Sequence, residues 1–554
     1  MMTTTDRPAS FEKIWETDNP PSRDWPLYTR GNVGEVFPEV VLPFTWSLLG
    51  KAAEDGWRQA FVKMGLTADG DISDDESMVI LSVFGGYCYI NASYVRLLGV
   101  RAPGGKVENI DSMFFGESDA PAYESSDGDK NLKSSFRLAK TVLRLLRTKS
   151  LPDLEHDKAK ADRFVARYPG DDAGNDELLA YCRSFSPFFE HLFFRHIDNT
   201  FSNALVSGAL IDLIVKAGKP ELLVSVLGGI GDIESAAPSA AMWELSRLDP
   251  ESDEYAVGFE RFIRDHGTRG PNEWDIGSDP WAFRPAMATA AIDSMRAADD
   301  THAPVLQARR LAEARADAIA EVKAELNPID RFQFDKSLAA TALYSQARER
   351  SKTTVIKVIH AVRRAQRAMH DRTVERGGVA ERWKSCLLNV DEFERYLDDP
   401  AQFTDLIEQR AELHERLAGL IPPFIVDGVV PGIDTWGERS GAADQMSSGQ
   451  TLQGIAGCPG VARGRARVVL DAGDPGDLGP GDVLIAPITD PSWTPLFLAA
   501  EAVVVDVGAT MSHAVIVSRE LGIPCVVSAV GATRSIPDGA EIEVDGNTGV
   551  VTVL

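Results

Sequence analysis

The residue with the clearest chemical potential is His513, which follows Ser512 in the segment 505–519. A valine-rich stretch ends at Gly508, small residues follow it, and serine is a favourable helix N-cap. These signals predict that His513 lies in the first turn of a helix that follows a strand. Neutral imidazole is a nucleophile near pH 7, and a helix N-terminus favours a bound anion. The pattern is typical of a phosphoryl carrier; a histidine that merely packs at a helix start is the alternative.

Two cations, Arg348 and Lys352, are four residues apart in a predicted helix and therefore share one face. The same face continues as Val355, Ile359 and Val362. Two like charges beside an apolar stripe lower stability unless an anion pairs with them. A phosphoryl group in transit is such an anion. The alternative is a solvated helix face, because other cations lie nearby.

The remaining histidines are less informative. His266 stands close to Arg269 in a glycine-containing segment, where it is a candidate general base for an acceptor hydroxyl; a structural loop residue is the alternative. His191 and His196 are five residues apart and do not share a helix face, so we interpret them as packing or surface residues. The five cysteines form no CxxC pair. We therefore predict neither a metal site nor a disulfide framework.

Aromatic residues crowd the first part of the chain. They are candidates for the lining of an apolar pocket, and the alternative is a hydrophobic core. They are Trp25, Phe37, Phe44, Trp46, Phe84, Tyr87, Tyr89, Tyr94, Phe114 and Phe115.

A multidomain chain must position these residues, because 554 residues exceed the size of one core. Residues 1–24 are predicted as an N-terminal tail and 25–426 as a large, mainly α-helical domain. Residues 427–450 are rich in Gly, Asp, Ser and Thr and are predicted as a linker. Residues 451–554 contain short Val/Ile-rich strands and one helix, which predicts a compact α/β domain with a β/β/α arrangement.

The net charge of −26 disfavours nucleic acid and anionic lipid as partners. No run of about 18 apolar residues is present, and the N-terminus lacks the apolar region of a secretory signal. We therefore expect a cytoplasmic protein that binds neither nucleic acid nor a membrane.

The segment around His513, continued by residues 520–524, resembles the phosphohistidine signature of the phosphoenolpyruvate-utilising enzymes. That family includes phosphoenolpyruvate synthase, pyruvate phosphate dikinase, rifampicin phosphotransferase and phenylphosphate synthase. Residues 453–466 resemble the opening strand and glycine turn of its swivelling domain. The resemblance implies that His513 accepts the phosphoryl group. It also implies a phosphate-binding loop formed by Gly508, Ala509, Thr510 and Ser512.

One position departs from the signature. Many members carry threonine two residues before the histidine, whereas this chain has Met511. An apolar residue there resembles the rifampicin and phenylphosphate branch, and it puts regulation through that hydroxyl in doubt.

The large domain resembles the acceptor-binding domain of rifampicin phosphotransferases at residues 28–47, 86–91 and 267–273. In those enzymes an arginine and a lysine with the spacing of Arg348 and Lys352 serve the transferring phosphate. The resemblance therefore implies a catalytic role for both residues.

The source of phosphate is expected outside this chain. The acceptor-like region begins near Trp25, no GxxxxGK[ST] loop is present, and the sequence ends after the swivelling domain. The arrangement resembles phenylphosphate synthase. It implies that an ATP-grasp protein in trans binds Mg-ATP, and that this chain binds no cofactor of its own.

We therefore predict a phosphotransferase subunit that carries phosphoryl on His513 to the hydroxyl of a small, hydrophobic or aromatic acceptor. One alternative is a non-catalytic binding or regulatory relative, which Met511 and Thr268 would suit, because relatives often carry threonine and histidine, respectively, at these two positions. Another is the mobile subunit of a split phosphoenolpyruvate synthase-like enzyme. The identity of the acceptor and the oligomeric state are left open.

Overall fold

The computed structural model describes residues 11–67, 71–72, 76–102, 104–115, 120–126, 129–231, 234, 237–296, 300, 303–439, 445–508 and 512–554.

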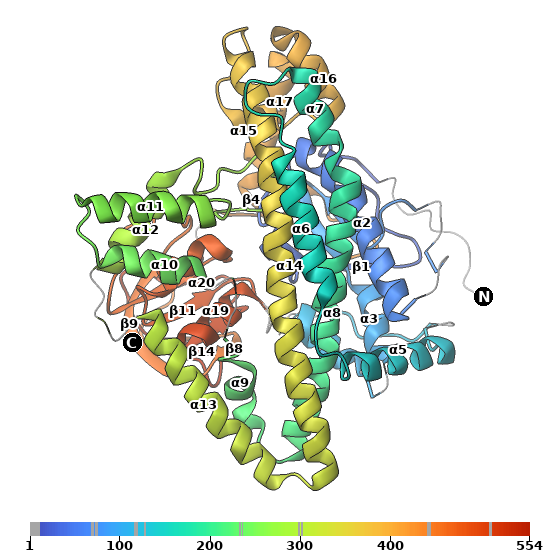
Figure 1. Ribbon diagram of the computed structural model, residues 1–554, viewed down its shortest axis with the longest axis vertical. Coiled ribbons are helices and arrows are strands. Elements are labelled where there is room, and N and C mark those ends of the chain that lie inside the picture. Colours follow the sequence, from blue (N-terminus) through green and yellow to red (C-terminus); the bar gives the residue numbers. More distant parts are fainter. Residues whose placement is uncertain are drawn as a thin grey trace.

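Three long helices form the centre of the large region. They are α2 (Pro43–Met64), α8 (Phe185–Lys216) and α14 (Pro328–Val374), and α8 packs against both of the others. In Figure 1, α14 runs along most of the long axis of the molecule. It begins where the side chain of Asn327 accepts hydrogen bonds from two backbone amides and a proline occupies the first turn. These helices form the rigid frame on which the candidate residues are mounted.

Shorter helices surround this centre. The segment 393–420, which has a helical pattern, divides at Pro400, because proline cannot continue a helix from the preceding turn. The other helices of the large region are α1 (Val33–Val36), α3 (Ala92–Arg101), α4 (Val107–Phe114), α5 (Leu132–Leu145), α6 (Pro152–Ala166), α7 (Asn175–Arg183), α9 (Leu223–Leu227), α13 (Pro304–Glu325), α15 (Arg382–Ser385), α16 (Val390–Asp398) and α17 (Thr404–Ala418).

A small sheet lies beside the central helices. Its strands follow the order β2-β3-β1-β5, with β1 at Leu27–Thr29, β2 at Leu81–Phe84, β3 at Tyr87–Asn91 and β5 at Ile425–Asp427. The strand β5, at the start of the expected linker, pairs antiparallel with β1. The linker also contains β6 (Gly437–Glu438), which pairs with β4 (Leu420–Ile421). Its first part is therefore anchored to the large region by backbone hydrogen bonds.

Part of the segment assigned to an N-terminal tail also belongs to this region. Trp15 is 1% exposed, and its indole nitrogen donates a hydrogen bond to the carbonyl oxygen of Val41 at 2.8 Å. Residues 11–24 therefore pack against the large region where they are described.

The C-terminal region is built on a mixed sheet of eight strands in the order β7-β14-β13-β9-β10-β11-β12-β8. The strands β9 to β12 are parallel to one another, and the remaining pairs are antiparallel. Helix α19 (His513–Leu521) connects β11 to β12, and Gly522 ends it at φ 68°. The strands are β7 (Thr451–Gln453), β8 (Ile455–Cys458), β9 (Val461–Val468), β10 (Asp482–Ala486), β11 (Ala502–Val505), β12 (Cys525–Val527), β13 (Glu541–Asp545) and β14 (Val550–Val553). The two short helices of this region are α18 (Thr494–Phe497) and α20 (Ala532–Ser535).

Three helices from the middle of the chain pack on this C-terminal sheet. They are α10 (Ala237–Ser246), α11 (Asp253–His266) and α12 (Pro285–Arg296), drawn in green beside the red sheet in Figure 1. Their buried side chains, among them Met242 and Ile292, form one hydrophobic cluster with side chains of the C-terminal sheet region. The stretch 25–426 therefore contributes to the hydrophobic core of the C-terminal region as well as to its own.

No helix among the described residues combines the length and the apolar character needed to cross a bilayer.

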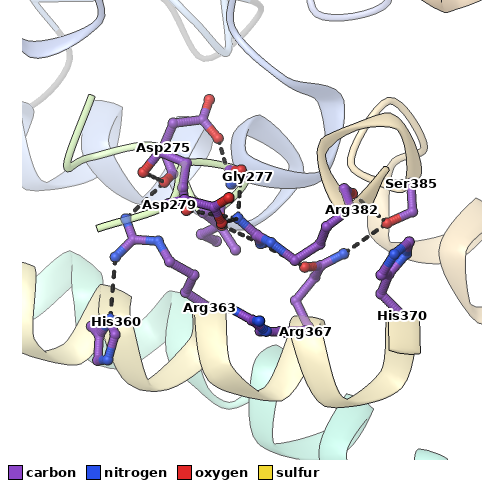
Figure 2. A network of polar contacts seen from close by, with 12 residues as sticks. Asp275, Gly277, Asp279, His360, Arg363, Arg367, His370, Arg382 and Ser385 are labelled. Carbon is purple, nitrogen blue, oxygen red and sulfur yellow. Dashed lines mark hydrogen bonds and ion pairs between the residues drawn. The ribbon is translucent and has the colours of Figure 1, made fainter. Parts of the chain in front are cut away.

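A buried polar network holds the loop 273–279 against α14 (Figure 2). The guanidinium of Arg363, which is fully buried, donates to the carbonyl oxygens of Glu273 and Asp275 at 2.9 and 2.8 Å. Arg382 donates to the carbonyl oxygens of the next three residues, 276 to 278. The carboxylate of Asp275 accepts a hydrogen bond from the hydroxyl of Thr45 at 2.6 Å. This network fixes the backbone that carries Glu273.

We predict that Arg363→Met destabilises the protein by about 2–4 kcal/mol, because two buried carbonyl oxygens lose their donor. Thermal unfolding followed by circular dichroism measures this as a lower Tm. The control is Arg367→Met on the same helix, whose half-exposed guanidinium stacks on Phe283. An unchanged Tm for Arg363→Met would contradict the prediction.

Candidate functional site

Helix α19 begins at His513, as the serine before it predicts. The side chain of Ser512 accepts a hydrogen bond from the backbone amide of Val515 at 3.3 Å. Of the expected phosphate loop, Gly508 and Ser512 are described, whereas Ala509 and Thr510 lie outside the described residues, as does Met511. Because His513 is the first residue of α19, its imidazole lies at the positive end of the helix dipole.

Both ring nitrogens of His513 face threonine hydroxyls. The Nδ1 atom is 3.1 Å from Oγ1 of Thr489, and Nε2 is 3.2 Å from Oγ1 of Thr494. A hydroxyl can donate or accept, so either neutral tautomer is satisfied. Burial, followed by the charges of Lys352 and Arg269, lowers the pKa of His513 well below its ordinary value. The ring is therefore neutral at physiological pH, and one nitrogen keeps the lone pair that a nucleophile needs.

The backbone amide of His513 donates to a carboxylate from the opposite end of the chain. Oε2 of Glu35, on the short helix α1, accepts this hydrogen bond at 2.9 Å. Burial raises the pKa of Glu35 to about 7, against the effects of this hydrogen bond and of Arg348 and Lys352. Glu35 was not predicted as a site residue. It lies in a segment that carries the family resemblance, but nothing in its spacing indicates that it meets residue 513.

The structure brings Arg348 and Lys352 to the same place as His513. The ammonium of Lys352 lies 3.1 Å from Oε1 of Glu273, and Arg269 lies 2.7 Å from Oε2 of the same carboxylate. Arg348 is 3.8 Å from the carboxylate of Glu349. Burial alone would raise the pKa of Glu273, but Arg269 and Lys352 lower it below its ordinary value. The carboxylate of Glu273 thus pairs with Lys352, which needs a counter-ion because it lies beside an apolar stripe of α14.

His513, Arg348 and Lys352 share the wall of a mainly apolar cavity of about 200 Å³. Three of the aromatic residues singled out in the sequence, Phe37, Trp46 and Phe114, line it, and the other seven do not. The further aromatic residues of its lining are Trp57, Phe189, Phe193, Phe201 and Trp274. An apolar cavity with a few charged groups at one side is typical of a small-molecule site.

His196 also lines this cavity, although we interpreted it as a packing or surface residue. Its Nδ1 is 3.1 Å from the hydroxyl of Ser351, and its ring packs against Trp274. Burial, assisted by Arg348 and Lys352, lowers the pKa of His196 to about 3, so the ring is neutral. His191 instead pairs with Asp157 at 2.8 Å. Across the described ranges, no group of three or more His, Cys, Asp or Glu side chains is arranged to hold a metal ion.

The structure does not bring His266 to this cavity. It is the last residue of α11, and its ring packs against Phe262 with 5.4 Å between ring centroids. Burial lowers the pKa of His266. The neighbouring Arg269 reaches the site through Glu273, so the segment contributes a guanidinium and not an imidazole.

The raised pKa of Glu35 predicts a pH-dependent stability. The ordinary pKa of 4.5 applies to the unfolded chain, so between about pH 4.5 and 7 the folded protein retains a proton that the unfolded chain releases. Stability therefore falls as the pH rises through this window. We predict that Glu35→Gln removes this loss and raises stability near pH 8 by about 3 kcal/mol, with little effect near pH 5.

Thermal unfolding of both proteins at the two pH values tests this prediction. Glu313→Gln, at an exposed helical position, is the control and should match the unsubstituted protein at both. Equal stabilities of the Glu35→Gln variant and the unsubstituted protein near pH 8 would show that the carboxyl group ionises without cost.

Two protein families match parts of the chain. Residues 478–549, which include His513, match the mobile domain of PEP-utilising enzymes. Residues 196–353, which include Arg348 and Lys352, match the fourth domain of rifampicin phosphotransferase.

Relatives extend this similarity over the whole chain. An uncharacterized protein of Mycobacterium tuberculosis is 27% identical over 97% of this chain and 63% of its own length. The chain thus spans less than two thirds of that relative. A rifampicin phosphotransferase of a Streptomyces species is 31% identical over 58% of this chain and 37% of its own length. The prodigiosin synthesizing transferase of Serratia marcescens is 26% identical over the full chain and 66% of its own length. The chain therefore contains segments that match the mobile domain of PEP-utilising enzymes and a domain of rifampicin phosphotransferase, and it is similar to the rifampicin phosphotransferases.

Proposed function

We propose that this chain is a phosphotransferase that transfers a phosphoryl group from His513 to a hydroxyl of a small, apolar or aromatic acceptor. The observation that carries the proposal is the position of His513 in the wall of an aromatic cavity that also contains Arg348 and Lys352. The histidine comes from the C-terminal sheet region, and the cavity is otherwise formed mainly by the large region. This is the arrangement expected when a carrier residue is presented to an acceptor site.

In the proposed step, the acceptor oxygen forms a bond to phosphorus while the bond between phosphorus and the imidazole nitrogen of His513 breaks. The phosphorylated ring carries a proton on its other nitrogen, which faces a threonine hydroxyl. The nitrogen that leaves phosphorus therefore keeps the electron pair, and the ring returns to neutral imidazole. Arg348 and Lys352 stabilise the charge on the phosphoryl oxygens. Lys352 already pairs with Glu273, and the phosphoryl group competes with that carboxylate for it.

We assign Glu35 as the acceptor of the hydroxyl proton. It lines the cavity, and its pKa of about 7 is near the operating pH, which suits a general base. The neutral ring of His196 is a weaker base because burial holds its pKa at about 3.

Loading of His513 requires the C-terminal region to leave this cavity. We propose that it visits an ATP-grasp protein that acts in trans and binds Mg-ATP, in the cytoplasm, and that the segment 427–450 permits the movement. Because α10, α11 and α12 share a hydrophobic core with the C-terminal sheet, these helices move with it. A movement of residues 451–554 alone would expose that core to water.

We predict that the protein gains about 80 Da, the mass of one phosphoryl group on the nucleophile, after incubation with Mg-ATP and its nucleotide-binding partner. Intact-mass spectrometry measures the gain, which should be labile in acid and absent from the His513→Ala variant. Circular dichroism checks that this variant is folded. An equal gain in the variant would refute the role of His513, and no gain with any partner would favour a binding or regulatory protein.

We predict that Lys352→Met lowers the rate of transfer to the acceptor by about 100-fold or more, because one charge that stabilises the phosphoryl oxygens is lost. The mass gain that reports loading of His513 should persist. Lys357→Met on the same helix is the matched control, since Lys357 is half-exposed and pairs with Asp162 away from the cavity. Equal transfer rates in the two variants would exclude Lys352 from the reaction.

A further inference from the structure

Helix α5 exposes large apolar side chains to solvent. Leu132, Phe136 and Leu143 are 89%, 75% and 54% exposed. Their spacings of four and seven residues place them on one side of the helix. The opposite side carries Leu138 and Leu145, which are buried against the protein. The helix is therefore apolar on two sides, and only one of these sides is covered.

Exposed cations flank this apolar stripe. No acidic residue occurs between Asp129 and Asp153, in a chain whose net charge is −26. Within the described ranges, none of the cations on or just after α5 forms an ion pair with another residue. They are Lys133, Arg137, Lys140, Arg144, Arg147 and Lys149. Among the described residues, the cluster therefore has no acidic ion-pair partner, although the chain contains 83 acidic residues.

An apolar cavity opens beside the same helix. It has a volume of about 910 Å³, and Ala139, Val142 and Leu143 of α5 form part of its wall. Met113 and Arg348 line both this cavity and the smaller one at His513. On the other flank of α5, a second hollow is lined by several of the cations. The helix therefore separates an apolar hollow from a basic one. Figure 1 places α5 at the edge of the molecule, far from the C-terminal sheet.

We propose that α5 is a docking surface for an anionic lipid membrane. Leu132, Phe136 and Leu143 would insert at the boundary of headgroups and acyl chains, and the cations would bind lipid phosphates. Helices that lie on a membrane combine these two features and need not cross it. This proposal departs from the expectation that the net charge of −26 excludes an anionic membrane as a partner. The acidic remainder of the chain is screened beyond about 8 Å at physiological ionic strength, so the local charge of α5 acts on a surface in contact with it.

A lipid surface fits these observations better than an acidic protein does. The exposed leucine and phenylalanine side chains and the large apolar cavity beside them are suited to contact with acyl chains, which are apolar as well. If the proposed phosphotransfer is correct, this surface also brings an apolar acceptor from the bilayer to the cavity that adjoins the one at His513. The docking itself does not depend on that function.

Co-sedimentation of the full chain with vesicles tests the proposal. The protein is expected to bind vesicles of phosphatidylcholine mixed with phosphatidylglycerol, to leave vesicles of phosphatidylcholine alone unbound, and to dissociate as salt is raised. Leu132→Ser combined with Phe136→Ser should lower partitioning by about tenfold or more, since both apolar side chains lose their place in the lipid. Arg137→Gln combined with Arg144→Gln should lower it selectively at low salt.

The matched control is Ile329→Ser combined with Phe332→Ser on α14, at positions that are 72% and 64% exposed. It should bind as the unsubstituted chain does, and circular dichroism should show that all variants are folded. Failure of the unsubstituted chain to bind anionic vesicles overturns the proposal and leaves an acidic protein as the partner of α5. Equal loss in the control variant overturns it as well. Neither ATP nor an acceptor is present, so this result is separate from that of the phosphotransfer experiments.

Discussion

The ion pairs of Glu273 with Arg269 and Lys352 are the interaction on which the site depends. A cation that lines an apolar cavity is costly unless a carboxylate pairs with it, and Glu273 pairs both with Lys352, which lines the cavity, and with the buried Arg269. The position of Glu273 is fixed in turn, because Arg363 and Arg382 donate hydrogen bonds to the carbonyl oxygens of the loop that carries it. The long helix α14 contributes both Lys352 and Arg363. One rigid helix therefore positions the cation and also the arginine that holds the loop of Glu273, its counter-ion.

A polar contact joins the C-terminal region to the large region at His513. Glu35 accepts the backbone amide of His513 at the helix N-terminus, where an anion is stabilised by the helix dipole. A single carboxylate hydrogen bond at this point can be exchanged for another anion at a modest cost in free energy. In contrast, α10, α11 and α12 are joined to the C-terminal sheet through apolar side chains. The contact of the C-terminal sheet with α10, α11 and α12 therefore buries more apolar surface than the hydrogen bond between Glu35 and His513 does.

The two cavities lie next to each other in the large region and share the side chains of Met113 and Arg348 in their walls. The small cavity is aromatic and carries the charged groups, whereas the larger one is apolar and extends to α5. The same side chain, Leu143, lies in the wall of the larger cavity and in the exposed apolar stripe. Helix α5 therefore borders the larger cavity, which in turn shares wall residues with the cavity at His513.

Part of the secondary structure could be predicted from the sequence, because it depends on local interactions. Ser512 predicts the start of α19, and the Val/Ile-rich segments predict β9 to β14, because caps and strand patterns depend on neighbouring residues. The spacing of Arg348 and Lys352 predicts their common face for the same reason. Glu35, Glu273 and His196 reach the site from distant segments, and their partners depend on packing between elements far apart in the chain. Tertiary structure alone decided that Glu35 meets His513, that α10 to α12 join the C-terminal core, and that His266 stays outside the cavity, since no local pattern encodes contacts across hundreds of residues.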